Sequence, residues 1–325
     1  MSRGLVLLLA SVALWLVPAV KAAPIQPPIH PDEAKILQEI IRTEGHDVTA
    51  AEMPGWARKG VIKALEPYGI DGQSLKSWAV AGGEKKALFL SVVYQPDGRV
   101  LALTGNGPWL SNDSIRLLAG MPELRLIRID HNGTLDKKTT DRYDGSGFDA
   151  LALSKLAEIK IGLSFNDRGM EQVAKIRGLK SFSVGHSRVS DVGVAFFEGH
   201  PNLERFSVAE MASGRITAKS LSSIAKMPKV SQVGFHEIFI GYDGGLAQLA
   251  PMRGRLTKLD LSMSLVNADD LARFKADHPE AVITTISPAE IVKRHRFIAA
   301  KLAKQATGPI GEEMKRAVAA AASPK

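Results

Sequence analysis

The feature that most constrains the fold is a short apolar pattern that recurs along the middle of the chain. Each unit has apolar residues at relative positions 1, 4 and 6, and most units start 23 to 27 residues after the previous one. The units start at Leu124, Leu156, Leu179, Leu203, Val230 and Leu256. A unit this short cannot bury its own apolar face, so it must stack on its neighbours. The pattern therefore predicts a solenoid of stacked units.

Each predicted strand is followed by a second pattern, which is typical of a short capped helix. A polar residue precedes apolar residues four and seven positions later, so both apolar side chains share one helical face. The five polar residues are Ser111, Asn166, Ser190, Thr217 and Asn267. Each unit is thus predicted to run strand, turn, helix, turn, with parallel strands on one face of the solenoid and helices on the other.

These segments resemble the leucine-rich-repeat family. The strand pattern is similar to the family's L-x-x-L-x-L motif, and the helical return is similar to its longer, ribonuclease-inhibitor-like class. Residues 97–103 (DGRVLAL) and 189–194 (VSDVGV) resemble phrases of exported bacterial members. The resemblance covers residues 97–287. It implies an α/β solenoid with strands on the concave face and helices on the convex face, and a scaffold that binds other macromolecules, most often proteins, without catalysis.

The chain departs from the family at relative position 9, which is usually an asparagine that bonds to neighbouring loop backbone. Asn106 and Asn132 fit, whereas serine stands at positions 164, 187 and 264. Met211 and Ile238 have no equivalent polar group. We therefore expect the contacts between successive loops to be disturbed between residues 211 and 242.

The segments that flank the repeats have different compositions. Residues 1–22 combine an arginine, a short apolar run and a small-x-small sequence, which is typical of a secretory signal peptide. Residues 23–31 are proline-rich and predict a linker. Residues 32–96 predict a small, mainly helical N-terminal cap with a hairpin that joins it to the solenoid of residues 97–287. Residues 288–325 predict a basic C-terminal helix, closing the last repeat, and a disordered tail.

Composition narrows the class of protein further. The chain has no cysteine, which excludes disulfides, zinc-thiolate sites and a thiol nucleophile. Together with the signal-like N-terminus, this favours an exported bacterial protein, periplasmic or extracellular, that is soluble after cleavage. The net charge of +8 becomes 8 − 2 = +6 when Arg3 and Lys21 are removed. That moderate charge requires no nucleic-acid partner, and we expect a monomer.

The candidate binding face consists of strand residues between the apolar anchors, because strand side chains alternate between the two faces of a sheet. It is basic in its early units and small and flat in the middle. The functional interpretation is a floor that binds an acidic or extended partner, and the alternative is an ordinary solvated strand face. The candidate residues are Arg128, Asp130, Lys160, Arg205, His236, Lys258 and Asp260.

A second candidate is an apolar run at a position where a polar loop is expected. It comprises Ile238, Phe239, Ile240 and Tyr242. Such a run either forms an exposed patch that anchors a partner or packs under the next helix. The sequence contains none of the nucleotide-binding, zinc-protease or nucleophile-elbow motifs, so we predict no catalytic residue, no cofactor and no metal.

Three functions remain open at this stage. The first is an exported, non-catalytic scaffold that binds a protein or an anionic cell-surface polymer. The second is an accessory subunit of a secreted hydrolase, or a hydrolase itself. The third is peripheral attachment to a membrane or cell wall through the basic C-terminal helix, since cations interleaved with apolar residues suit an anionic surface.

Overall fold

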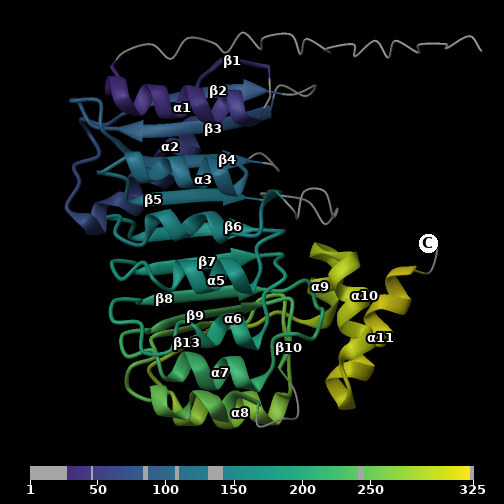
Figure 1. The fold of residues 1–325 in the computed structure, drawn as a ribbon. Coiled ribbons are helices and arrows are strands. Elements are labelled where there is room, and N and C mark those ends of the chain that lie inside the picture. The colour runs from purple at the N-terminus through teal and green to yellow at the C-terminus, as the bar shows by residue number, and fades with distance from the viewer. Residues whose placement is uncertain are drawn as a thin grey trace, which may run out of the picture.

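In the computed structural model, residues 28–44, 47–82, 87–106, 110–130, 142–240 and 245–322 are described, so the predicted signal peptide lies outside the described residues. One sheet of eleven strands runs through the molecule (Figure 1). In sheet order its strands are β1 (Val48–Ala51), β2 (Lys76–Gly82), β3 (Ala87–Tyr94), β4 (Val100–Asn106), β5 (Leu126–Asp130), β6 (Glu158–Gly162), β7 (Ser181–Gly185), β8 (Arg205–Ala209), β9 (Gln232–His236), β11 (Lys258–Asp260) and β13 (Val282–Thr284).

Strand direction divides the sheet into two parts. The three pairs between β1 and β4 are antiparallel, and every pair from β4–β5 onward is parallel. Parallel neighbours need a crossover, which is usually a helix. The predicted α/β class is therefore confirmed at the level of a solenoid-like stack of strand–helix units.

The crossover helices pack on one face of this sheet (Figure 1). They are α3 (Asn112–Leu117), α5 (Asp167–Val173), α6 (Asp191–Ala195), α7 (Ala218–Ala225) and α8 (Ala268–Asp277), with short 3-10 helices η2 (Leu118–Gly120), η3 (Ser146–Leu151) and η4 (Gly245–Met252). All five predicted N-cap residues are confirmed. Each side-chain oxygen accepts a hydrogen bond from a backbone N–H of the first helical turn, which satisfies a donor that the helix itself leaves unpaired.

A spine of phenylalanines fills the space between the strands and the helices. Phe182 is 1% exposed, and its ring centroid lies 5.9 Å from that of Phe165, 5.2 Å from that of Phe197 and 5.9 Å from that of Phe206. The register aligns Ile159, Phe182 and Phe206 across three strands. Successive units therefore bury their apolar faces against each other, as the short repeat requires.

The serines at the disturbed ladder position contact neighbouring loops through their hydroxyl groups. The Ser187 hydroxyl donates to the carbonyl of Ala209 at 3.1 Å, and the Ser264 hydroxyl donates to the carbonyl of Phe235 at 2.9 Å. A hydroxyl therefore replaces the expected amide in these two units.

In the two units with Met211 and Ile238 at relative position 9, buried glutamates bind the loop backbone. Glu210 is 0% exposed and accepts hydrogen bonds from the backbone N–H groups of Ser213 (3.0 Å), Gly214 (2.9 Å) and Arg215 (3.0 Å). Glu237 is 4% exposed and accepts from the N–H of Met211 at 3.0 Å. The predicted disturbance is thus accommodated by carboxylates that lie next to position 9.

The N-terminal region differs from the mainly helical cap that the sequence predicts. Helix α1 (Pro31–Glu44) packs on the crossover-helix face, where the carboxylate of Glu44 accepts from the N–H of Ser111 at 2.8 Å. Strands β1, β2 and β3 extend the main sheet. Helix α2 (Gly55–Leu65) and the 3-10 turn η1 (Glu66–Tyr68) pack on the opposite face, where Val61 and Leu65 share a cluster with Leu126 of β5.

The C-terminal region also differs from its prediction. Three helices follow β13: α9 (Pro288–Arg294), α10 (Arg296–Gln305) and α11 (Gly308–Ala322). The last of these occupies residues expected to be disordered. The three helices pack on each other and on loops at the carboxyl ends of the strands, through Ile298, Leu302 and Leu265, and Val282 of the last strand stays 65% exposed. The unit therefore lies beside the solenoid and does not close its end (Figure 1).

Of the two alternatives for the apolar run, the buried one describes Ile238 and Ile240, which are 2% and 5% exposed. A short strand pair, β10 (Phe239–Ile240) with β12 (Leu265–Val266), holds this segment. Ile238 and Ile240 belong to the main core, and Phe239 packs against the cluster of the C-terminal helices. The run therefore joins two cores, and Tyr242 lies outside the described residues.

Candidate functional site

The face opposite the crossover helices, which we call the strand face, carries the candidate binding residues. Strand register aligns their side chains in rows across the sheet, for example Ser181, Arg205 and Gln232. Neighbouring strands lie about 4.8 Å apart, so side chains in one row are close neighbours. The predicted alternation is therefore realised, and the rows form a continuous surface from β6 to β11.

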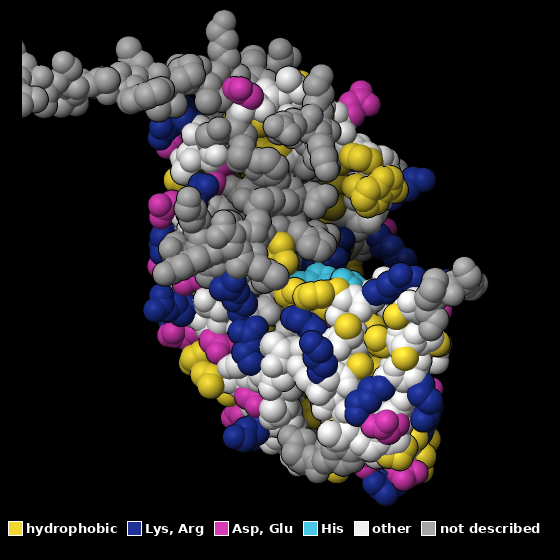
Figure 2. Space-filling view, turned by 90° about the vertical axis from the view of Figure 1, so that its right-hand side faces the viewer, with side chains coloured by type: hydrophobic (Ala, Val, Ile, Leu, Met, Phe, Trp, Pro, Cys, Tyr) yellow, Lys and Arg dark blue, Asp and Glu magenta, His cyan; other side chains and the backbone are white. Residues whose placement is uncertain are grey.

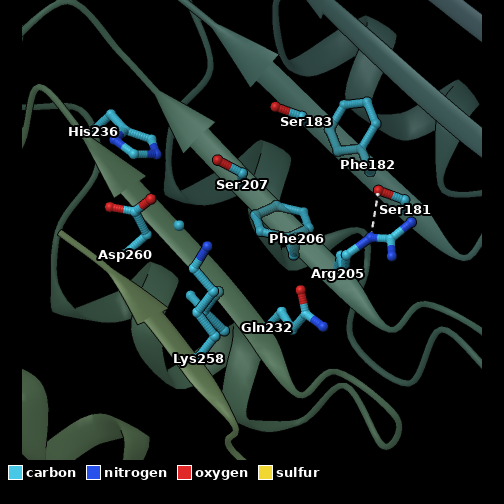
Figure 3. Close-up of a pocket in the computed structure, with 12 residues that line it drawn as sticks. Ser181, Phe182, Ser183, Arg205, Phe206, Ser207, Gln232, His236, Lys258 and Asp260 are labelled. Carbon is cyan, nitrogen blue, oxygen red and sulfur yellow. Dashed lines mark hydrogen bonds between the residues drawn. The ribbon is translucent and has the colours of Figure 1, made fainter. Parts of the chain in front are cut away.

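A shallow hollow of about 180 Å³ lies over β7, β8, β9 and β11 on this face (Figure 3). Small side chains form its floor: Ser183 and Ser207, with Gly234 beyond them. Longer polar side chains stand around this floor, namely Arg205, Gln232, His236, Lys258 and Asp260. Four of the predicted residues therefore meet at one place: Arg205, His236, Lys258 and Asp260.

The basic character of the early units is partly neutralised. Arg128 donates to Glu158 from Nε at 2.7 Å, and a terminal nitrogen of Arg205 lies 3.6 Å from the same carboxylate. The side chain of Glu158 is 9% exposed, so the carboxylate is held between the two guanidinium groups. Lys160 is exposed on the next row, away from the hollow. Sequence alternation placed Glu158 on this face but did not show that it binds both arginines.

Two further residues complete the account of the candidate face. Asp130 lies at the end of β5, and its side chain is outside the described part of the chain. Leu126 points to the strand face as expected from alternation, but it is 0% exposed because α2 covers it. The open part of the face therefore begins later along the solenoid than the sequence indicates.

His236, Asp260 and Ser262 form a hydrogen-bonded group at one side of the hollow. The Nδ1 of His236 donates to the backbone carbonyl of Ser262 at 2.6 Å, and the Ser262 hydroxyl donates to Asp260 at 2.7 Å. A hydrolytic triad needs the histidine to accept the serine proton. Here the Ser262 hydroxyl donates to the aspartate, so Ser262 is not arranged as the nucleophile of such a triad.

The pKa of Asp260 lies below its ordinary value. Burial raises this pKa, but hydrogen bonds from the hydroxyl and N–H of Ser262, with the nearby His236 and Lys258, outweigh burial and lower it. Each of these groups favours the carboxylate form. Asp260 is therefore charged in the folded protein at neutral pH and presents an anion beside the cation of Lys258.

This shift predicts a pH-dependent contribution of Asp260 to stability. A depressed folded pKa stabilises the fold above the unfolded value, near 3.8, and the contribution is lost as pH falls through the folded value. We expect Asp260→Asn to lower the melting temperature at pH 7, and the difference from the wild type to shrink at pH 3. Thermal melts of both proteins at the two pH values measure this, and a difference that does not change with pH would contradict it.

Metal binding is not indicated on this face. Within the ranges that the structure describes, no group of three or more His, Asp or Glu side chains is arranged to hold a metal ion. Among the helices of the same ranges, none combines the length and apolar character needed to cross a membrane.

No protein-family model matches the chain, and no curated protein matches its sequence. The molecule is thus characterised by its own architecture: an α/β solenoid-like stack with a polar hollow on its strand face.

Proposed function

We propose that this chain is an exported scaffold of the leucine-rich-repeat type, which holds a segment of another protein on its strand face and performs no chemistry. The L-x-x-L-x-L pattern, the capped helical returns and the solenoid-like stack support the repeat class. The signal-like N-terminus and the lack of cysteine support export. Proteins of this architecture bind partners on extended surfaces made by stacked units.

The observation that carries the proposal is the shape of the hollow. Ser183, Ser207 and Gly234 form a low row, and longer side chains stand on both sides, at Arg205 and Lys258 on one and at His236 on the other. The two flanking rows lie four residues apart along the strands, which is about 13 Å at standard strand rise. That width accommodates an extended polypeptide lying across the strands.

The charges favour a protein over an anionic polymer. A polyanion needs a row of uncompensated cations. Here Glu158 forms ion pairs with both Arg128 and Arg205, and Asp260 lies beside Lys258. Mixed charge with hydroxyl donors suits peptide groups and side chains of both signs. An anionic cell-surface polymer is the alternative partner.

Blocking the low row tests the proposed binding face. We expect Ser207→Trp to fill the floor of the hollow and to reduce capture of the native partner from an envelope or secretome extract at least tenfold, because the partner must lie where the indole would stand. Lys219→Trp, at an exposed position on α7 of the opposite face, is the matched control and should leave capture unchanged. Capture that survives Ser207→Trp would place the partner elsewhere.

The identity of the captured material separates the alternatives. A photo-reactive side chain at the exposed position of Gln232 should cross-link to a polypeptide. Cross-links to carbohydrate or lipid, with no protein adduct, would replace the protein proposal with the polymer alternative. Hydrolysis of a substrate by the purified chain would overturn the non-catalytic proposal.

Peripheral membrane attachment is supported by charge alone. Figure 2 shows Lys and Arg side chains spread over the C-terminal helical unit. Ile291, Ile298 and Leu302, which would have inserted into a membrane, are each 0% exposed inside that unit. An amphipathic helix needs an accessible apolar face for insertion. Because these apolar side chains are buried, only the positive charges support membrane attachment.

A further inference from the structure

The last strand of the sheet, β13, has an outer edge that pairs with no other strand in the part of the chain that the structure describes. The N–H of Val282 donates to the carbonyl of Thr257 at 2.9 Å, and the carbonyl of Thr284 accepts from the N–H of Leu261 at 2.8 Å. Successive residues of a strand direct their backbone groups to opposite edges. The N–H and C=O of Ile283 therefore point away from β11, where a further strand can pair with them.

The composition of this edge favours strand pairing. Residues 281–286 (AVITTI) carry no charge and no proline, and all but the first are β-branched. Exposed edges in natural sheets are often protected by charged residues or proline, and this segment has neither. Val282 is 65% exposed, and Thr284 and Thr285 are also exposed. The edge is therefore accessible and chemically suited to a second strand.

The hydrophobic core is also incompletely covered at this end. Leu271 of α8, Ala281 and Ile283 pack against the main core cluster but are only partly buried. The terminal units of repeat proteins need a polar outer face as a cap. Here the three C-terminal helices lie beside the solenoid (Figure 1). A partner that covers this end must therefore supply both a strand and an apolar surface.

A second copy of the same chain meets both requirements. Helix α8 precedes β13 in the last unit, so antiparallel pairing of two β13 strands sets the two α8 helices two strand intervals apart, or roughly 10 Å. Packed helices lie about 8–10 Å apart, so Leu271 of each copy would be covered by the other. An unrelated single strand would pair with the edge but leave this apolar end uncovered.

We propose that two copies of this chain associate by antiparallel pairing of their β13 strands, with Ile283 on the twofold axis. In this register Ile283 exchanges two hydrogen bonds with its counterpart, and the N–H of Thr285 donates to the carbonyl of Ala281 of the second copy. Both copies use the same surface, so the assembly closes at a dimer. The dimer replaces the monomer that we expect from the sequence, and it does not depend on the function proposed for the strand face.

Disulfide cross-linking tests this register, because the chain has no cysteine of its own. Val282 lies opposite Thr284 of the second copy, in a non-hydrogen-bonded pair whose Cα atoms are about 4.5 Å apart. A disulfide can bridge that distance. A mixture of Val282→Cys and Thr284→Cys, one of them carrying a tag, should therefore form a disulfide-linked heterodimer on mild oxidation.

Each cysteine variant on its own is the control. Identical residues of the two copies lie diagonally across the strand pair, with their Cα atoms about 8 Å apart, which is too far for an unstrained disulfide. Each variant alone should therefore cross-link much less than the mixture. No heterodimer in the mixture, or equal cross-linking of each variant alone, would overturn the proposal.

Sedimentation equilibrium of the full mature chain measures the association. We expect a dimer with a dissociation constant of about 10 μM or lower. Thr285→Pro removes an outward N–H and should weaken the dimer at least tenfold, whereas Thr285→Ser keeps this N–H and should not. Val282→Lys places a charge on the edge and should also weaken the dimer at least tenfold, whereas Val282→Thr is its uncharged β-branched control.

Thermal melts followed by circular dichroism show whether each variant keeps the fold. If Thr285→Pro melts well below the wild type, Val282→Lys decides the outcome, because its side chain replaces one that is already exposed. A wild-type chain that stays monomeric or grows into open polymers would overturn the proposal. A dimer that folded Val282→Lys retains at full strength would overturn it as well.

Discussion

Phe182→Ala is expected to destabilise the protein by about 4 kcal/mol, the largest effect of any single side-chain truncation that we predict. The ring is 1% exposed and contacts the rings of Phe165, Phe197 and Phe206. Truncation removes the burial energy of a phenylalanine and leaves a cavity that the flanking units, held in register by backbone hydrogen bonds, cannot close. Chemical denaturation followed by circular dichroism measures the change.

Because Phe182 lies in the middle of the stack, its truncation should also change the cooperativity of unfolding. In repeat architectures each unit contacts only its neighbours, so weakening one interface uncouples the parts on either side. We expect the Phe182→Ala transition to broaden or to separate into two steps. Phe297→Ala, which removes a ring that is 53% exposed, is the control and should change stability by less than about 0.5 kcal/mol. Equal effects of the two substitutions would contradict the proposed spine.

Glu210→Ala is expected to lower the free energy of unfolding by about 3 kcal/mol, the second largest effect that we predict. The carboxylate is 0% exposed and accepts hydrogen bonds from three consecutive backbone N–H groups, those of Ser213, Gly214 and Arg215, as well as from the Ser213 hydroxyl. Alanine leaves these donors without a protein acceptor and removes the group that shapes the loop into α7. Equilibrium denaturation at pH 7 provides the measurement.

The amide variant separates charge from shape at this position. Glu210→Gln keeps the volume but turns an NH2 group toward backbone donors, so it should recover less than half of the loss. Glu204→Ala, at an exposed glutamate in the same repeat, is the matched control and should be close to neutral. A wild-type stability for Glu210→Gln would show that the loop needs no anion.

The strand and helix units were predictable because their signals are local and repeat. Ser190, for example, predicts the start of a helix because a serine hydroxyl can cap a free backbone N–H. In the structure its side chain accepts a hydrogen bond from the N–H of Val192 at 3.2 Å. Burial of the strand anchors follows from the same repeat, since every unit needs its neighbour. The α/β class and the positions of the five capped helices therefore follow from spacing alone.

The terminal regions were predictable only in part, because their places depend on contacts with distant residues. Helix α2 has apolar side chains such as Val61, but its pattern does not show which face of the sheet it covers. The apolar residues Ile298 and Leu302 suggest a helix, but they do not show that it packs on loops beside the strands. Tertiary packing decided both outcomes.

The candidate site shows the same division. Alternation along the strands places Arg205, His236, Lys258 and Asp260 on one face, and they line one hollow. Alternation does not reveal that Glu158 binds two arginines, nor that Ile238 is buried. These features depend on side-chain reach and on the docking of the C-terminal helices, for which a single strand pattern carries no signal.

The placement of α2 sets the length of any segment that the strand face can hold. This helix and η1 occupy the face as far as β6, where the hydroxyl of Tyr68 lies 3.5 Å from the carbonyl of Ala157. Five strands, β7 to β13, stay open, and their four intervals span about 19 Å. That distance corresponds to roughly six residues of extended chain, so under the proposed function the bound segment would be a short linear motif within a partner.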